Sequence, residues 1–345
     1  MLVCVTGGTG FVGAHTIAAI VERGHQVRML VRDESTVERA LGTLGVARSA
    51  VEVAVGDVTD ETSVARAMRG ADAVVHAASV YSFDSRRHRE MRETNERGTD
   101  VVLRAARRAG ADPIVHVSSV VALVPSNALL HPGSPVGRPR ETYMASKAAA
   151  ERIARRQQRD GAPVVISYPP ALIGPHDPNL GDQNARLRNA LRGLMPMWPD
   201  GGFPVGDVRD TAELHARLLD SPVEGMARHF GPGHYISTRQ YVRILRAVTG
   251  RRLPAAFLPA RAMLSAGALT TVLQRFWPWH IPAEYGAIYT CACAPRVADD
   301  APSCGVVARP VAEAMTDAVR WLHVSGYLSE RQAGAVSVSA PVVAG

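Results

Sequence analysis

Hydrophobic residues follow two different spacings in the first half of the chain. Short, mainly apolar runs of four or five residues, such as 2–6 and 51–55, alternate with longer stretches in which apolar residues recur every three or four positions. The short runs are typical of buried strands, and the longer stretches are typical of amphipathic helices. Up to about Pro170 the pattern therefore predicts an α/β fold, in which a parallel sheet is covered by helices on both faces.

The pattern places individual elements along this half of the chain. The predicted strands are residues 2–6, 27–31, 51–55, 73–76, 114–117 and 164–167. The two longest predicted helices there are residues 89–109 and 141–159.

The character of the sequence changes after Pro169. Residues 173–178 are rich in turn-forming residues, and residues 179–202 show little periodicity. The segments 205–219 and 226–230 are predicted to return to the main sheet, and helices are predicted at 237–248 and 311–322. We therefore predict a nucleotide-binding domain and a smaller substrate-binding domain. The first comprises residues 1–175 with 203–232, the second comprises 176–202 and 233–330, and 331–345 is predicted to be a disordered tail.

A glycine-rich turn stands between the first predicted strand and the first predicted helix. Gly7, Gly10 and Gly13 follow the strand directly. Gly7 permits a tight turn, Gly10 lets the backbone approach a pyrophosphate, and Gly13 lets the helix pack closely on the strand. The N–H groups at the start of the helix would face the phosphates. A plain strand-to-helix turn is the alternative, but a second strand at the expected distance favours nucleotide binding.

The ends of the next strands indicate which nucleotide is bound. Arg32 closes the second strand and Asp33 follows it. In such folds an acidic residue here usually holds the ribose hydroxyls of NAD, whereas an arginine accommodates the 2′-phosphate of NADP. The sequence therefore predicts NADP (NADPH) in preference to NAD, with a solvent-facing Arg32 as the alternative. Asp57 is expected near the adenine, and Ala77 and Ala78 against the cofactor.

Lys147 is the only lysine of the chain, and all other long cationic side chains are arginines. It stands four residues after Tyr143, so the two side chains share one face of the predicted helix. A nearby positive charge favours the ionised form of a phenol, whose ordinary pKa is about 10. Tyr143 is thus predicted to act as an acid or base near neutral pH. A chance pairing of the two residues on a helix is the alternative.

Composition and charge indicate an ordinary globular protein with a small-molecule ligand. Of the 345 residues, 46% are hydrophobic and 21% are charged. The net charge of +7 comes from arginines dispersed along helices, without the aromatic-interleaved basic stripe of a nucleic-acid-binding protein. The most apolar stretch, 262–272, is too short to span a bilayer, although it could lie on a membrane surface.

Cysteine usage and the first residues indicate the compartment. Cys4, Cys291, Cys293 and Cys304 have no zinc-site spacing, so no metal is predicted. The first residues pass directly into a strand and do not resemble a signal peptide. We therefore expect a cytoplasmic protein without an integral membrane segment. A homodimer is compatible with the sequence.

Together these motifs resemble the extended short-chain dehydrogenase/reductase family, within the NAD-dependent epimerase/dehydratase superfamily, over about residues 1–325. The resemblance implies a Rossmann-type doubly wound parallel sheet. It is greatest for the branch of dihydroflavonol reductase-like and 3β-hydroxysteroid dehydrogenase-like enzymes, and nucleotide-sugar epimerases and dehydratases form the neighbouring branch. The matching motifs are residues 6–13, Asp57, Asn95 with Gly98 and Thr99, Ser118 with Ser119, Tyr143 with Lys147, and Pro169 with Gly174 and Pro175.

The resemblance also implies roles for individual residues. Tyr143 would protonate a carbonyl oxygen during reduction, Lys147 would lower the pKa of the tyrosine and bind the nicotinamide ribose, and Ser119 would bind the same substrate oxygen. Ser118 is the alternative for this serine, and Asn95 is expected to support the structure and not to react. The implied cofactor contacts are Gly7, Gly10, Phe11, Val12, Gly13, Arg32, Asp57, Val58, Ala77, Ala78, Tyr143, Lys147 and Pro169.

The expected substrate is apolar. Tyr168 stands where the sugar-nucleotide relatives commonly have an arginine, which puts an inherited substrate contact there in doubt. Apolar side chains are frequent in 175–204 and 253–282, and they could line a pocket for a steroid-like or flavonoid-like ketone or form a core. These are Leu180, Leu191, Leu194, Met195, Met197, Trp198, Phe257, Met263, Leu264, Phe276 and Trp277.

Two other functions remain open from the sequence. A nucleotide-sugar epimerase or dehydratase would use the same Tyr143 and Lys147, and Arg186, Arg188 and Asn179 could serve its diphosphate. Tightly copurifying NAD would distinguish it from a reductase that exchanges NADPH. A non-catalytic NADP-sensing module is disfavoured, because such a protein need not keep the serine, the tyrosine and the lysine together.

Overall fold

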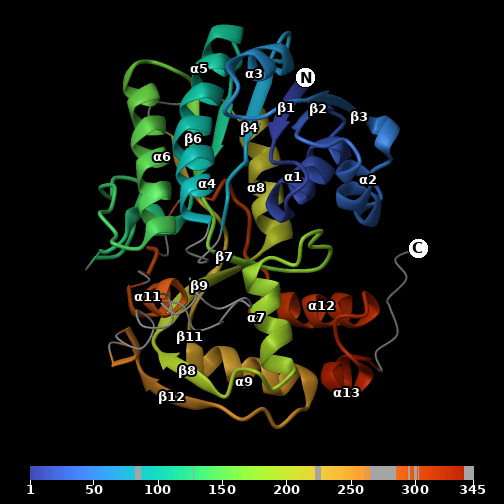
Figure 1. The fold of residues 1–345 in the computed structure, drawn as a ribbon, viewed down its shortest axis with the longest axis vertical. Coiled ribbons are helices and arrows are strands. Elements are labelled where there is room, and N and C mark those ends of the chain that lie inside the picture. Colours follow the sequence, from blue (N-terminus) through green and yellow to red (C-terminus); the bar gives the residue numbers. More distant parts are fainter. Residues whose placement is uncertain are drawn as a thin grey trace.

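A computed structural model describes residues 1–81, 87–126, 128–221, 227–260, 262–264, 285–293, 296–298, 301 and 303–337. Its largest element is a seven-stranded sheet in which all pairings are parallel (Figure 1). In sheet order the strands are β10 (Arg228–Phe230), β6 (Val164–Tyr168), β5 (Ile114–Val117), β4 (Ala73–His76), β1 (Leu2–Thr6), β2 (Gln26–Val31) and β3 (Val51–Val55).

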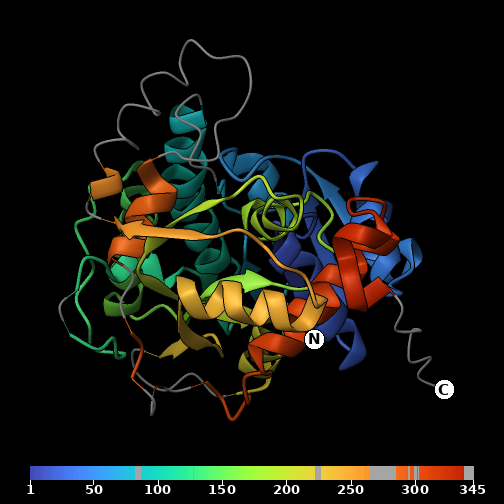
Figure 2. The same ribbon diagram turned by 90° about the horizontal axis from the view of Figure 1, so that it is seen from below.

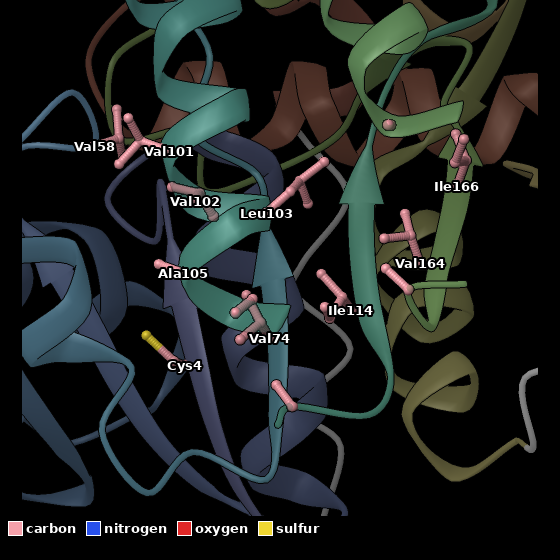
Figure 3. Packing of buried hydrophobic residues seen from close by; sticks show 14 of the residues in the cluster. Cys4, Val58, Val74, Val101, Val102, Leu103, Ala105, Ile114, Val164 and Ile166 are labelled. Carbon is pink, nitrogen blue, oxygen red and sulfur yellow. The ribbon is translucent and has the colours of Figure 1, made fainter. Parts of the chain in front are cut away.

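Helices cover both faces of this sheet and bury its apolar side chains. One face carries α1 (Phe11–Glu22), α2 (Thr36–Leu41) and α8 (Val208–Asp220). The other carries α3 (Glu61–Ala67), α5 (Thr99–Ala109) and α6 (Thr142–Arg159). Figure 3 shows the second core, where Val102 and Leu103 of α5 lie over Val74 and Ile114 of the sheet. Because strands buried on both faces must be apolar throughout, the short apolar runs of the sequence became these strands.

The strand order creates a crevice at one edge of the sheet. The chain proceeds outward from β1 through β2 to β3 and then crosses to β4 on the other side of β1. In open parallel sheets ligands bind outside the carboxyl ends of the strands at such a reversal. The ends of β1, β4 and β5 therefore define where a site is expected.

A second, smaller part of the fold lies beyond these strand ends, in the lower half of Figure 1. It holds a three-stranded and a two-stranded sheet, and the helices pack around a core of their own. The elements are β7 (Ala171–Ile173), α7 (Asp182–Leu191), β8 (Met197–Asp200), β9 (Gly202–Asp207), β11 (His234–Ser237), α9 (Thr238–Thr249), β12 (Ala256–Pro259), α11 (Tyr285–Cys293), α12 (Val311–Val324) and α13 (Glu330–Ala333).

The remaining elements are short. Helix α4 (His88–Arg92) leads into a π-helical segment, η4 (Glu93–Gly98), which continues into α5. Single 3₁₀ turns are η1 (Gly42–Leu44), η2 (Arg48–Ala50), η5 (Val120–Leu123) and η6 (Gly334–Ser337). Seen from below in Figure 2, α9 and β12 lie across the smaller part, with the sheet and helices of the larger part behind them. Among the described residues no helix is long and apolar enough to cross a membrane.

The prediction of an α/β fold with a doubly wound parallel sheet is confirmed, and each predicted strand is present to within one residue at either end. Two local predictions are wrong. Residues 203–207 do not enter the main sheet, because β9 pairs with β7 and β11, although α8 and β10 do return to it. Residues 331–337 are helical and not disordered, since Ala333 and Val336 are buried in the smaller core. Residues 338–345 lie outside the described residues.

Candidate active site

One cavity of about 760 Å³ opens at the carboxyl ends of the central strands. Its lining includes every residue predicted to be catalytic or to contact the cofactor. These are Gly7, Gly10, Phe11, Val12, Gly13, Arg32, Asp57, Val58, Ala77, Ala78, Ser119, Tyr143, Lys147 and Pro169. The structure therefore brings together residues that lie up to 162 positions apart in the chain, and the roles of these residues stay predictions.

The glycine turn has the geometry of a phosphate cradle. Gly7 has φ +76°, and a Cβ atom at this position would lie 2.5 Å from the backbone nitrogen of Ala78. A Cβ on Gly13 would collide with the carbonyl group of Gly7. Only glycine fits either position. Helix α1 begins at Phe11 with no side chain capping its first N–H groups, so these donors are available to an anion.

The next two strand ends contribute one exposed cation and one carboxylate. Arg32 directly follows β2, and its side chain is 72% exposed with Glu90 4.0 Å away. The carboxylate of Asp33 turns back to its own segment, because it accepts hydrogen bonds from the backbone nitrogen and hydroxyl of Ser35 at 2.9 and 2.7 Å. Asp57 accepts from the backbone and hydroxyl of Thr59. Arg32 therefore reaches this part of the cavity more freely than Asp33 does.

Asn95 holds the wall of the cavity. From the π-helical segment η4 its side-chain oxygen accepts a hydrogen bond from the backbone nitrogen of Val80 at 2.8 Å and one from Ser79 at 3.0 Å. Its amide nitrogen donates to the carbonyl oxygen of Val80 and to Ser146 on α6, both at 3.0 Å. These bonds tie α6 to the segment after β4. The expectation that Asn95 supports the structure is thus met by its contacts.

The buried start of helix α6 positions Tyr143. The carboxylate of Glu141 accepts hydrogen bonds from the backbone nitrogens of Tyr143 and Met144 at 3.0 and 2.9 Å. Glutamate is not among the usual N-cap residues, so the residue type does not predict this role. Tyr143 also makes a hydrogen bond with Ser119, and its ring packs edge-on against Tyr81 with the ring centroids 4.6 Å apart.

The two serines differ in their surroundings. The Ser119 hydroxyl accepts a hydrogen bond from the backbone nitrogen of Val121 and meets Tyr143. The Ser118 hydroxyl is buried and has no hydrogen-bond partner within the described part of the chain. Both serines line the cavity. The contact with Tyr143 favours Ser119 as the serine that shares a substrate oxygen with the tyrosine.

Burial dominates the electrostatics at Tyr143. Burial raises the pKa of its phenol well above the usual value, and Tyr81 and Glu141 act in the same direction, while the hydrogen bond from Ser119 opposes them. Lys147 is not among the main groups that shift this pKa, so the expected effect of the lysine on the tyrosine stays a prediction. The Lys147 ammonium donates to the carbonyl oxygen of Val117 at 3.3 Å, and burial lowers its own pKa to about 8.

Tyr168 belongs to a buried polar network behind the site. Its hydroxyl donates to Glu151 at 2.7 Å and accepts from Arg155 at 3.1 Å, and Arg155 pairs with Glu151 at 2.6 Å. Since Tyr168 does not line the cavity, the doubt about a substrate contact at this position was justified. The network instead joins α6 to β6.

The segment after β7 closes over the glycine turn. The Asn179 amide nitrogen donates to the carbonyl oxygen of Thr9 at 3.1 Å, and Arg39 of α2 donates to its side-chain oxygen at 3.5 Å. The buried carboxylate of Asp177 accepts from the backbone nitrogens of Asn179 and Gly181. Asn179 therefore lies at the phosphate end of the cavity. Of the three residues considered for a diphosphate from the sequence, Asn179 lines the cavity, whereas Arg186 and Arg188 are not among its lining residues.

Of the two uses considered for the apolar side chains of these segments, core packing is the more frequent in the structure. Leu180 lines the cavity, but Leu191 and Trp198 are buried in the smaller core and Leu194 and Met197 are 61% and 59% exposed. Met195 and Phe257 pack against that core, and Leu264 packs near Tyr143. Phe276 and Trp277 lie outside the described residues. The residues that do form this wall include Tyr81, Gln183 and Phe203, which no periodic pattern marks in the sequence.

Comparison with known proteins agrees with the geometry. A model of the NAD dependent epimerase/dehydratase family matches residues 3–233. The chain belongs to this family. Membership establishes an oxidoreductase of the extended short-chain type with a nicotinamide dinucleotide site, in line with the resemblance inferred from the motifs.

Relatives in the family extend over most of the chain. Sterol demethylase protein B of Methylococcus capsulatus is 29% identical over 336 residues, which are 95% of this chain and 100% of the relative. A putative dihydroflavonol 4-reductase of Synechocystis is 30% identical and covers 74% of each chain. Among solved structures, that of gox2253 has a TM-score of 0.79 at 26% identity and covers 95% of this chain and 99% of its own.

Proposed function

We propose that this protein transfers a hydride between NADP(H) and a ketone or secondary alcohol. The observation that carries the proposal is the meeting of Ser119, Tyr143 and Lys147 at a cavity that continues to the glycine turn. Reductases among the relatives support the reaction type. The four cysteines are free, which suits the reducing cytoplasm. The proposed partners are a small-molecule substrate and a second copy of the chain in a homodimer.

The side chains supply the proton chemistry of reduction. A ketone oxygen at this end of the cavity would accept hydrogen bonds from the hydroxyls of Tyr143 and Ser119. Hydride transfer to the carbonyl carbon is the chemistry that a bound reduced nicotinamide would supply. Tyr143 then gives its proton to the forming alkoxide, and the Lys147 ammonium stabilises the phenolate that remains. Because burial raises the pKa of Tyr143, the phenol holds its proton at neutral pH, which is the state that a proton donor needs.

NADP is the proposed cofactor. Arg32 stands exposed at the end of β2, whereas Asp33 is occupied by Ser35. A guanidinium at this strand end can pair with a 2′-phosphate through two hydrogen bonds. The same residues leave the ribose hydroxyls of NAD without an acidic partner.

The function is tested with a panel of ketones and alcohols, from aromatic and polycyclic compounds to nucleotide sugars, followed by NADPH absorbance. Reduction of a hydrophobic ketone with NADPH, and slower turnover with NADH, is the expected result. An epimerase or dehydratase would instead convert a nucleotide sugar with no net change of NADPH and would copurify with NAD. A protein that binds NADPH but converts no compound of the panel would support the sensing module.

A further inference from the structure

Arg186 on α7 lies beside the wall of the cavity, next to Phe203, and has no close counter-ion among the described residues. Its guanidinium carbon lies 5.5 Å from the centroid of the Phe203 ring, and Phe203 lines the cavity. The side chain is half-buried, yet within the described ranges Arg186 makes no hydrogen bond and no ion pair. Arg188, one helical step further, is by contrast hydrogen-bonded to Asn189.

The groups around Arg186 leave its charge largely uncompensated. Burial raises the pKa of the Tyr241 phenol to about 12 and also raises the pKa values of Tyr81 and Cys291, so all three are neutral at pH 7. Asp182, one turn earlier on α7, is the neighbouring carboxylate, and it acts from beyond ion-pairing distance. A half-buried cation costs free energy unless it is paired, and the Phe203 ring offsets only part of this cost.

A second polar group faces the same ring. The Tyr241 hydroxyl is buried and has no hydrogen-bond partner in the part of the chain that the structure describes. The ring centroid of Tyr241 is 5.8 Å from that of Phe203, and the Arg186 charge acts on the pKa of this phenol. Arg186 and the Tyr241 hydroxyl are therefore two hydrogen-bond donors next to the Phe203 ring, and a guanidinium is a donor that an anionic group binds well.

Contacts between side chains connect this position to Tyr143. The rings of Tyr143 and Tyr81 are 4.6 Å apart, and Gln183 donates to the Tyr81 hydroxyl at 3.2 Å. Gln183 and Arg186 are three residues apart on α7, which places their side chains on the same face. One helical turn rises about 5.4 Å, so the span from the Tyr143 ring to the guanidinium is on the order of 10 Å.

We propose that Arg186 binds a carboxylate at the end of the substrate remote from its carbonyl group. The inference rests on the proposed function for the assignment of this cavity to the substrate. A planar guanidinium pairs with a carboxylate through two parallel hydrogen bonds. A single arginine with Asp182 nearby suits one negative charge better than the charges of a diphosphate. The substrate class is therefore an apolar oxo acid or hydroxy acid.

The test uses 4-(4-acetylphenyl)butanoate and its methyl ester, a pair in which only the acid is charged. Binding of each compound to the NADPH complex is measured by calorimetry, and turnover is measured by NADPH absorbance. The wild-type protein is expected to bind the acid about tenfold to a hundredfold more tightly than the ester, the scale of a charge-assisted pair. Arg186→Gln should abolish this difference, and Arg186→Lys should retain part of it. Arg188→Gln is the matched control and should leave the difference unchanged.

A second variant is expected to strengthen binding of the acid, in contrast to Arg186→Gln. Asp182→Asn removes a neighbouring negative charge and should tighten binding of the acid severalfold without affecting the ester. NADPH affinity and thermal unfolding confirm that each variant is folded. Equal binding of acid and ester by the wild type, no binding of either, or an unchanged preference in Arg186→Gln would overturn the proposal. Preferential binding of a uridine diphosphate sugar through Arg186 would replace it by the diphosphate alternative.

The result separates this inference from the proposed function. If the acid binds through Arg186 but no ketone is reduced, the carboxylate site stands and the reductase function is wrong. If acid and ester are reduced equally well, the reductase function stands and the carboxylate site is wrong.

Discussion

The two walls of the cavity are built from different kinds of residues. The cofactor wall consists of backbone and small side chains at the ends of parallel strands, as at Gly7, Ala77 and Pro169. The opposite wall consists of longer side chains from α7, β9 and the segment after β4, among them Gln183, Phe203 and Tyr81. Steric limits on the backbone determine the first wall, whereas packing between distant segments determines the second.

The difference also appears in the charges. On the cofactor side the Arg32 side chain is exposed, so its charge stays in contact with water until a ligand binds. On the substrate side the charged and polar groups, including Arg186 and Asp182, are partly or fully removed from water. An exposed charge contributes little to the free energy of folding. A half-buried charge destabilises the fold unless an opposite charge or hydrogen bonds compensate it. Substitutions on the two walls should therefore affect different measured quantities.

The largest effect is expected where the two walls meet, at Tyr143. Tyr143→Phe should lower the rate of ketone reduction by roughly two to four orders of magnitude, because it removes the proton donor. NADPH affinity should remain close to that of the wild type, since the ring still fills its place against Tyr81. Single-turnover kinetics and NADPH titration measure the two quantities. Tyr327→Phe, at a tyrosine that packs on Trp321 in the smaller core, is the matched control.

A rate for Tyr143→Phe within threefold of the wild type would show that the phenol is not the proton donor. It would also remove the reason for assigning the Ser119 contact to catalysis.

A smaller effect, confined to the cofactor wall, is expected at Arg32. Charge-assisted hydrogen bonds contribute about 1.5–3 kcal/mol each, so Arg32→Asp should weaken NADPH binding roughly tenfold to a hundredfold. The new carboxylate should gain contact with the ribose hydroxyls and improve NADH binding. Titration of both cofactors measures the change, and Arg243→Asp, at an exposed position on α9, controls for net charge. Tighter binding of NADH than of NADPH by the wild type would contradict the assignment of NADP.

The residues of the cofactor wall could be predicted from the sequence, whereas most residues of the opposite wall could not. The glycine turn, Asp57 and the pair of Tyr143 and Lys147 follow from local chemistry at strand ends and on one helix face, and all four parts line the cavity. Trp198 and Leu191 are apolar enough to line a pocket, but in the structure they lie in the core of the smaller part. Composition cannot distinguish these two uses, because both bury apolar surface.

Other residues of the site carry no local signal. Glu141 caps α6 although glutamate is not a preferred cap, and Tyr81 meets Tyr143 across 62 positions of the chain. The burial that raises the pKa of Tyr143 comes from several distant segments, so the spacing of Tyr143 and Lys147 alone does not show it.

The dependence of the rate on pH tests whether the positive charge of Lys147 is needed. Burial lowers the pKa of Lys147 from 10.5 to about 8, and Glu151 opposes this shift. The ammonium is lost above this pH, so the rate of reduction should fall about tenfold per pH unit there. Unfolded lysine keeps its proton to about pH 10.4. Between these values the unfolded chain binds more protons, and this group makes the folded protein more stable as pH rises.

Thermal unfolding across the same range separates the two effects. A falling rate with an unchanged or rising melting temperature is expected. A rate that stays level to pH 10 would show that the charge of Lys147 is not needed in catalysis.

The smallest effect is expected where the segment after β7 reaches across to the cofactor wall. Asn179→Ala removes the hydrogen bond to the carbonyl oxygen of Thr9 and the contact with Arg39. One neutral hydrogen bond contributes about 0.5–1.5 kcal/mol, so release of NADPH should become roughly twofold to tenfold faster. Stopped-flow fluorescence of the bound NADPH measures the rate, and Asn189→Ala on α7, away from the glycine turn, is the control. Because Asn179 touches the phosphate end only, the affinity of a substrate analogue for the NADPH complex should be unchanged. A variant that releases NADPH at the wild-type rate but binds the analogue more weakly would place Asn179 on the substrate wall, and the division of the cavity into two walls would then be wrong at this segment.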